Sequence, residues 1–77
     1  MPHVNIKYYP RTFTDEQRER LSQELNAVVR EHFDAYEGAV SIALEPVAEQ
    51  DWMRTVHGPE LTERAHLLIR TPNYRTS

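Results

Sequence analysis

The sequence predicts an α/β fold (α+β in stricter usage), in which a β-α-β unit is followed by a C-terminal helix. Apolar and polar residues alternate over residues 2–9 and again over 39–44, as in half-buried strands. Between them, residues 15–34 place apolar side chains at helical spacing. A strand, a long helix and a strand form a right-handed unit with parallel strands. With 77 residues, the chain is expected to form one domain, residues 1–77.

The first strand and the helix each have a clear boundary signal. The strand from Pro2 to Tyr9 is expected to end before Pro10, because proline cannot donate to a sheet ladder. Thr14 and Gln17 form a capping box, which starts the helix. The helix is expected to bury one apolar stripe. This stripe consists of Leu21, Leu25, Val28, Val29, His32 and Phe33.

The second strand is predicted at Ala39 to Leu44, after a turn at Gly38 and before Pro46. Its large side chains fall on one face and small ones on the other. A face of small side chains suits close approach of a ligand or another layer.

The C-terminal part is predicted to be helical. Residues 48–57 are expected to contain one helical turn, and Gly58-Pro59-Glu60 to start a further helix, because proline favours the first helical position. Pro72 is expected to stop this helix. Residues 73–77 are expected to form a loose end or a strap over a neighbouring chain.

A chain this small needs additional stabilisation. A two-stranded parallel sheet is not stable alone, and small domains usually recruit disulfides, metals or self-association. The sequence has no cysteine, which removes disulfides and thiolate sites. We therefore expect a homo-oligomer from the count of elements alone.

Composition excludes several classes of function. The net charge of −3 and the scattered basic residues give no surface for nucleic acid or acidic membranes. No apolar run approaches the ~18 residues of a membrane span, so we expect a cytoplasmic location. Two glycines cannot supply a phosphate loop, and no group of residues has metal-ligand spacing. No metal site is expected from these patterns.

The second residue offers a distinctive chemical group. Removal of Met1 would leave Pro2 with the only secondary amine in the chain, held at the end of a strand. If Met1 stays attached, the Pro2 nitrogen is an amide without basicity. Proline after an initiator methionine is common, so Pro2 alone does not establish a function.

Four stretches together resemble the 4-oxalocrotonate tautomerase family, over nearly the whole chain. They are Pro2-His3-Val4-Asn5-Ile6-Lys7, Thr14-Asp15-Glu16-Gln17, Ser41-Ile42-Ala43-Leu44 and Asp51-Trp52. The length and the C-terminal helix are most similar to a short dimeric bacterial subgroup. The resemblance implies a homodimer, with the hexamer of other members as the alternative. It also implies a cofactor-independent keto-enol isomerase whose general base is an N-terminal proline.

The resemblance also suggests site residues. Pro2 corresponds to the catalytic proline, Arg11 lies near the first substrate-binding arginine, and Trp52 stands at an aromatic wall. Ser41 replaces the second family arginine, which argues against a dicarboxylate substrate. Arg54 is a candidate replacement for that cation. Which subunit supplies the pocket arginine stays open.

Three functions remain open at this point. The first is a tautomerase acting on small enol or keto acids. The second is a related hydratase, dehalogenase or decarboxylase of unsaturated acids; a water-adding enzyme would need a water-activating carboxylate, and the sequence assigns none. The third is an oligomeric binding module without catalysis. Proline-dependent turnover of an enol acid separates the first function from the third.

Overall fold

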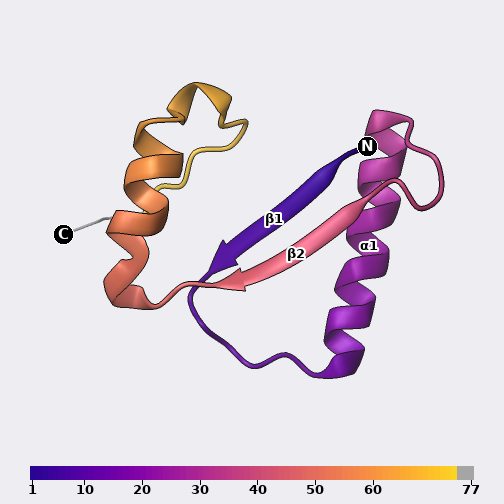
Figure 1. Ribbon diagram of the computed structural model, residues 1–77, viewed down its shortest axis with the longest axis horizontal. Coiled ribbons are helices and arrows are strands. Elements are labelled where there is room, and N and C mark those ends of the chain that lie inside the picture. The colour runs from indigo at the N-terminus through magenta and orange to yellow at the C-terminus, as the bar shows by residue number, and fades with distance from the viewer. Residues whose placement is uncertain (75–77) are drawn as a thin grey trace. The chain divides into compact units, whose positions relative to one another are not determined.

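The computed structural model describes residues 1–74, and the chain divides into two compact units, Met1–Pro46 and Val47–Ser77. The first unit contains strand β1 (His3–Tyr8), helix α1 (Asp15–Phe33) and strand β2 (Ser41–Pro46) (Figure 1). The two strands pair in parallel, so the predicted β-α-β fold is confirmed.

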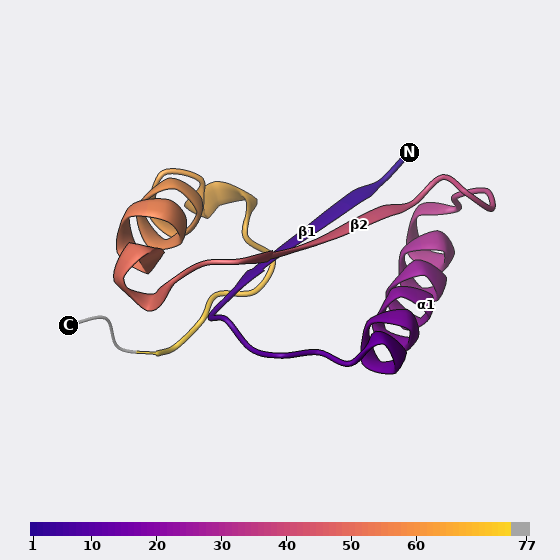
Figure 2. The same ribbon diagram turned by 60° about the horizontal axis from the view of Figure 1, so that its bottom comes forward.

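The sheet has one face toward α1 and one polar face. Ile42 and Leu44 of β2 line a hollow together with Leu21 of α1, which places α1 on their side of the strands (Figure 2). Because side chains alternate along a strand, the residues between them point to the opposite face. The register pairs the first residue of β1, His3, with the first residue of β2, Ser41.

Strand β2 begins and ends two residues later than predicted. The backbone N–H of Ala39 donates to the Tyr36 carbonyl at 3.1 Å, so Ala39 closes the turn instead of joining the sheet. Pro46 occupies the last strand position, opposite Tyr8. Proline is tolerated there because β2 keeps an open edge in a two-stranded sheet.

Helix α1 has the predicted start and a well-defined end. Thr14 Oγ1 accepts from the Gln17 backbone N–H at 3.1 Å, and the Gln17 side chain accepts from the Thr14 N–H at 2.8 Å, which confirms the capping box. At the other end, Asp34 adopts the left-handed conformation with φ of 51°. Gly38, with φ of 88°, then turns the chain into β2.

The predicted apolar stripe of α1 is only partly covered in one copy. Leu21, Leu25 and Val29 are half-buried. The prediction is wrong for the three other positions, because the two strands are too narrow to cover the whole stripe. Those exposed positions are Val28, His32 and Phe33.

The second unit consists of short helices, and its predicted helix start is wrong. A 3₁₀-helix η1 (Glu49–Asp51) confirms the expected single turn, and η3 (Ala65–Leu67) is another 3₁₀-helix. Between them, a π-helix η2 (Met53–Thr62) runs through the predicted start at Gly58-Pro59. A proline ring clashes with the carbonyl four residues earlier in an α-helix, and the wider π turn relieves this clash.

The buried core of one copy is small. Among residues 1–74, the buried apolar side chains are Ala39, Val47 and Val56, and none of them is fully buried. Within the same residues, no helix combines the length and apolar character that a membrane crossing requires. Such a small core is less than a stable domain of this length normally buries.

Candidate active site

A hollow opens at the end of the first unit where both strands begin. Because α1 returns antiparallel to the strands, its C-terminal end lies beside the N-terminus of the chain (Figure 1). The hollow has a volume of about 360 Å³. It is lined by Met1, Pro2, Phe33, Asp34, Ala35, Tyr36 and Ala39. The structure therefore puts the predicted catalytic residue beside the helix end and the following turn.

Pro2 is held in place by the start of β2. The Ser41 backbone N–H donates to the Pro2 carbonyl oxygen at 3.2 Å. His3 Nδ1 and Ser41 Oγ form a hydrogen bond of 2.7 Å on the polar face of the sheet. The structure thus brings Ser41 next to Pro2, because the two parallel strands begin at the same end of the sheet. His3, to which the sequence assigned no role, is a further polar side chain at this position.

The turn after α1 is fixed by Arg30. The backbone N–H groups of Asp34 and Ala35 both donate to the Arg30 carbonyl, the latter at 3.1 Å. Arg30 Nε donates to the Ala35 carbonyl at 3.2 Å, and its Nη1 pairs with Glu37 Oε2 at 2.6 Å. These bonds hold the turn that carries Tyr36, which forms one wall of the hollow.

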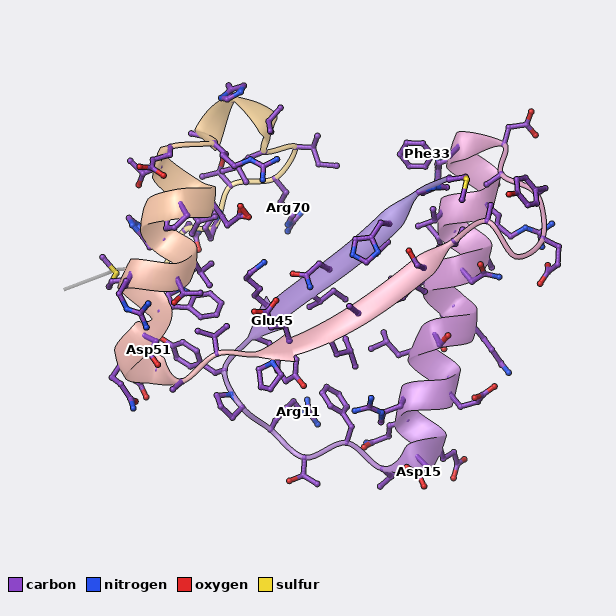
Figure 3. The ribbon with its side chains drawn as sticks, viewed as in Figure 1. Arg11, Asp15, Phe33, Glu45, Asp51 and Arg70 are labelled. Atoms are coloured by element: carbon purple, nitrogen blue, oxygen red, sulfur yellow. The ribbon has the colours of Figure 1, made fainter. Side chains whose placement is uncertain are left out.

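Arg11 lies at the other end of the sheet. It follows β1, and Figure 3 shows Arg11 and Phe33 at opposite ends of the strands. The Arg11 guanidinium stacks over the Phe13 ring, with its Cζ 4.7 Å from the ring centroid. The six residues of β1 span roughly 20 Å at about 3.3 Å per residue. Arg11 and Pro2 of one copy therefore cannot hold the same small molecule.

Trp52 and Arg54 belong to the second unit. Trp52 Nε1 donates to the Tyr74 hydroxyl at 3.2 Å, which brings the end of the described chain back to the indole. Arg54 Nη2 pairs with Asp51 Oδ1 at 2.9 Å. The substrate-binding roles of Trp52 and Arg54 stay predictions. The expected tail of residues 73–77 lies partly outside the described residues.

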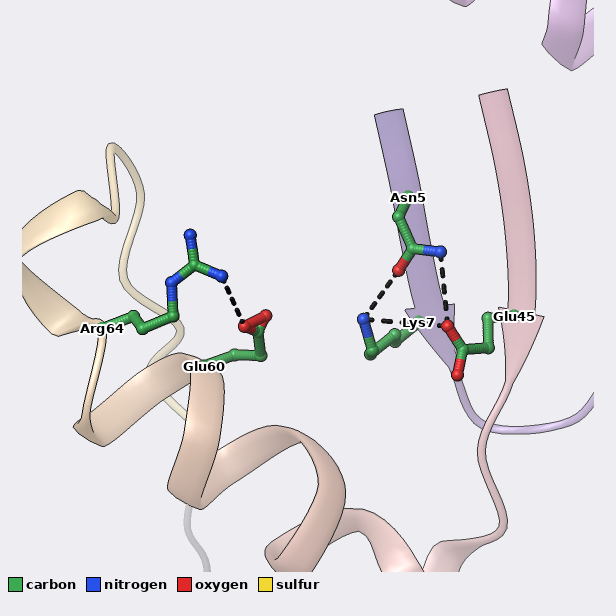
Figure 4. A network of polar contacts seen from close by, with 5 residues as sticks. All are labelled: Asn5, Lys7, Glu45, Glu60 and Arg64. Carbon is green, nitrogen blue, oxygen red and sulfur yellow. Dashed lines mark hydrogen bonds and ion pairs between the residues drawn. The ribbon is translucent and has the colours of Figure 1, made fainter. Parts of the chain in front are cut away.

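The polar face of the sheet carries a connected network. Lys7 Nζ donates to Asn5 Oδ1 at 2.7 Å and lies 3.7 Å from Glu45 Oε1, which also accepts from Asn5 Nδ2 at 3.3 Å (Figure 4). The same figure shows a separate pair within the second unit, between Arg64 and Glu60. In each group the basic side chain is paired with a glutamate carboxylate. Neither group therefore offers an unpaired cation for a substrate carboxylate.

No metal cluster is found in the described part of the chain. Among residues 1–74, no three histidine or acidic side chains converge in a way that could hold a metal ion. The hollow presents the Asp34 carboxylate and the aromatic rings of Phe33 and Tyr36, and the Pro2 nitrogen would gain the basicity of an amine only after removal of Met1.

Comparison with known proteins identifies the family. The family described as Tautomerase enzyme matches residues 2–62. The chain belongs to the tautomerase family. Tautomerase PptA of Enterobacter sp. (strain 638) is 38% identical over 96% of this chain and 97% of its own length. Over the same shares, Tautomerase PptA of Klebsiella pneumoniae subsp. pneumoniae is 39% identical and that of Cronobacter sakazakii 35% identical.

Family membership confirms the resemblance found in the sequence and makes the chain a tautomerase, an isomerase by class. It leaves the roles of individual residues open. The sequence did not single out Phe33, Asp34 and Tyr36 as site residues, although they line the hollow with Pro2. Their positions were accessible in principle, because a helix returning antiparallel to two parallel strands must end where those strands begin.

Proposed function

We propose that this chain interconverts the enol and keto forms of small carboxylate-bearing molecules, with the Pro2 amine as general base after removal of Met1. The observation that carries the proposal is the position of Pro2. In a chain of the tautomerase family, this residue directly precedes β1 and lines the hollow at that end of the strands. The reaction needs neither a metal nor an organic cofactor.

The chemistry depends on an uncharged amine. The neutral Pro2 nitrogen takes the proton from the enol hydroxyl, and the resulting ammonium returns a proton to the carbon end of the enolate. Apolar surroundings lower the pKa of an amine because they disfavour the charged form. The Asp34 carboxylate in the same hollow acts in the opposite direction. Apolar walls and a nearby guanidinium both lower the pKa of the amine. Together they must outweigh the opposite effect of Asp34 for the base to be neutral near pH 7.

The guanidinium is assigned to Arg11 of a second copy. Within one copy, β1, which spans roughly 20 Å, lies between Pro2 and Arg11. A second copy placed against the first brings its own Arg11 to the hollow. There it binds the substrate carboxylate and stabilises the developing enolate. Ser41 supplies no charge, so Arg54 remains the candidate for a second cation in the pocket.

The same second copy accounts for the small core. Between α1 and β2, a hollow of about 390 Å³ exposes parts of Leu21, Ile42 and Leu44, and Val28 of the stripe is 53% exposed. Both strands also keep an unpaired edge. A homodimer that extends the sheet and covers these side chains would complete the fold and the pocket together. A hexamer is the alternative assembly.

The test is ultraviolet monitoring of phenylenolpyruvate as it converts to its keto form. Processed protein, with removal of Met1 verified by intact mass, is expected to accelerate the conversion. A variant with an uncleaved N-terminal tag, whose Pro2 nitrogen is an amide, should lose this acceleration. Pro2→Ala should be impaired but retains a primary amine. Equal rates for all three proteins would reject Pro2 as the base and favour a binding module.

One observation favours a second activity on the same site. The Asp34 carboxylate lines the hollow with Pro2, which makes it the candidate for the water-activating carboxylate that addition of water to an unsaturated acid requires. Such a hydratase would lose water addition in Asp34→Asn while keeping proline-dependent tautomerisation. Loss of both reactions together would leave no separate role for Asp34 in activating water.

A further inference from the structure

Three side chains near the C-terminal end of β1 form a contiguous stack. The Phe13 ring meets the Tyr8 ring edge to face, with the centroids 5.6 Å apart and the planes at 74°. The Arg11 guanidinium lies over the Phe13 ring, with its Cζ 4.7 Å from the ring centroid. Both distances are usual for aromatic pairs and for cation–π contacts. Phe13 therefore links Arg11, on the segment between β1 and α1, to the last residue of β1 (Figure 3).

The two rings of this stack are better fixed than the arginine. Tyr8 is the last residue of β1 and is paired with β2, whereas Phe13 directly precedes Thr14, the cap of α1. The capping box holds Thr14 through two hydrogen bonds, of 3.1 and 2.8 Å. Tyr8 and Phe13 are half-buried, whereas Arg11 is exposed. The rings thus offer a firm support to a long side chain that would otherwise sample many rotamers.

Among residues 1–74, no carboxylate pairs with the Arg11 guanidinium. The arginines that do pair with a carboxylate in this part of the chain are Arg20, Arg30, Arg54 and Arg64. A guanidinium contacts a ring with its flat face, whereas its N–H donors lie along its edge. The contact with Phe13 therefore supports the cation and leaves donors for a bidentate bond to a carboxylate from outside this copy.

We propose that Phe13 is a positioning residue, which holds the Arg11 guanidinium ready for the substrate carboxylate in the pocket of the second copy. The inference rests on the proposed function, because it requires Arg11 to bind that carboxylate. A side chain that is ordered before binding loses less rotamer freedom when the ligand arrives, so the affinity is higher. Phe13 itself contacts no substrate and acts through Arg11, and Tyr8 supports its ring.

The test measures binding of cinnamate and cinnamamide to processed protein by isothermal titration calorimetry. Cinnamamide is the matched ligand, with a neutral amide in place of the carboxylate. Phe13→Leu keeps an apolar side chain but removes the ring face. It should weaken cinnamate binding by about two- to fivefold, the range of an exposed cation–π contact, and leave cinnamamide binding unchanged. The same effect on both ligands, or none on either, would overturn the role of Phe13.

Phe13→Tyr is the matched control variant at the same position. It keeps a ring face for the guanidinium, so cinnamate binding should stay within about twofold of the wild-type affinity. A loss as large as that of Phe13→Leu would contradict a contact made through the ring face.

A double-mutant cycle separates positioning from a general effect on the fold. In an Arg11→Ala background the ring has no guanidinium to hold. Phe13→Leu should then cause no further loss of cinnamate binding, or of kcat/KM for phenylenolpyruvate. This result decides the question even if cinnamamide binds too weakly to be measured. A further loss equal to that in the wild-type background would show that Phe13 acts independently of Arg11, and it would overturn the inference.

Three outcomes distinguish this inference from the proposed function. If Phe13 and Arg11 are coupled in cinnamate binding but turnover does not depend on the Pro2 amine, the proposed function fails and the inference stands. If turnover depends on Pro2 without such coupling, the inference alone fails. Unchanged cinnamate binding in Arg11→Ala would reject both the assignment of the carboxylate to Arg11 and the role of Phe13.

Discussion

The separation of Pro2 and Arg11 along β1 predicts complementation between two impaired variants. Pro2→Ala lacks the secondary amine, and Arg11→Ala lacks the guanidinium for the carboxylate. If each pocket takes Pro2 from one copy and Arg11 from the other, a mixed dimer contains one pocket with both residues. Its other pocket lacks both. If both residues came from one copy, each pocket of a mixed dimer would lack one of them.

The magnitudes follow from this arrangement. Loss of a charge-assisted hydrogen bond costs about 1.5–3 kcal/mol, so Arg11→Ala should lower kcat/KM by roughly 10- to 100-fold. Random mixing of equal amounts yields about half mixed dimers, and half of their pockets are intact, so about a quarter of wild-type activity should return. Loss of the Arg11–Phe13 contact should cost about 0.5–1 kcal/mol of stability, because it is an exposed cation–π pair.

The assay unfolds the two variants together, refolds them and measures phenylenolpyruvate ketonisation against separately refolded samples. Arg20→Ala is the control arginine: it is exposed on α1 and paired with Glu24 at 2.9 Å, so it should keep full activity. Activity of the refolded mixture equal to the mean of the separate variants, with mixed dimers verified by mass spectrometry, would refute the shared pocket.

Three further predictions concern the pocket charge and the local structure. Asp34→Asn removes an anion that favours the Pro2 ammonium, so the pKa of the amine should fall and the acid limb of the kcat/KM profile should move to lower pH; an unchanged limb would contradict this. Thr14→Ala should lower the free energy of unfolding by about 1 kcal/mol in urea titrations, because it removes the hydroxyl acceptor of the capping box; Arg18→Ala, exposed one turn later, should have a smaller effect. Gly38→Ala should cost about 1–2 kcal/mol through its φ of 88° alone, since nothing lies within 4 Å of the added Cβ, and an unchanged midpoint would show that the turn adapts.

Local signals predicted most of the first unit. The alternation in residues 2–9 and the capping box at Thr14 and Gln17 each depend on neighbouring residues only, and both features are present. The second unit was harder because its signal is ambiguous. Proline at a first helical position and proline inside a π-helix look alike locally, and the structure has the latter at Pro59. An added Cβ at Gly58 would approach the Met53 carbonyl oxygen to 3.3 Å, so glycine suits this closely packed position of the π-helix.

The candidate site was predictable where chain topology determines it. Because the two parallel strands begin at the same end of the sheet, Ser41 lies beside Pro2. The length of β1 keeps Arg11 away from Pro2 within one copy. Phe33 was expected in a buried stripe, since its spacing fits one and periodicity cannot tell a covered face from an uncovered one. Asp34 was expected only as a possible end of the helix, although it lines the hollow together with Pro2.

The central claim is that the Pro2 nitrogen is a free and neutral amine in the working enzyme. Nitrogen-15 magnetic resonance of proline-labelled, fully processed protein measures the protonation of that nitrogen directly across the pH range. The account predicts an amine that is mostly deprotonated near pH 7 and whose pKa matches the acid limb of the kcat/KM profile. An amine that stays protonated throughout the neutral range, or an amide nitrogen in fully active protein, would contradict it.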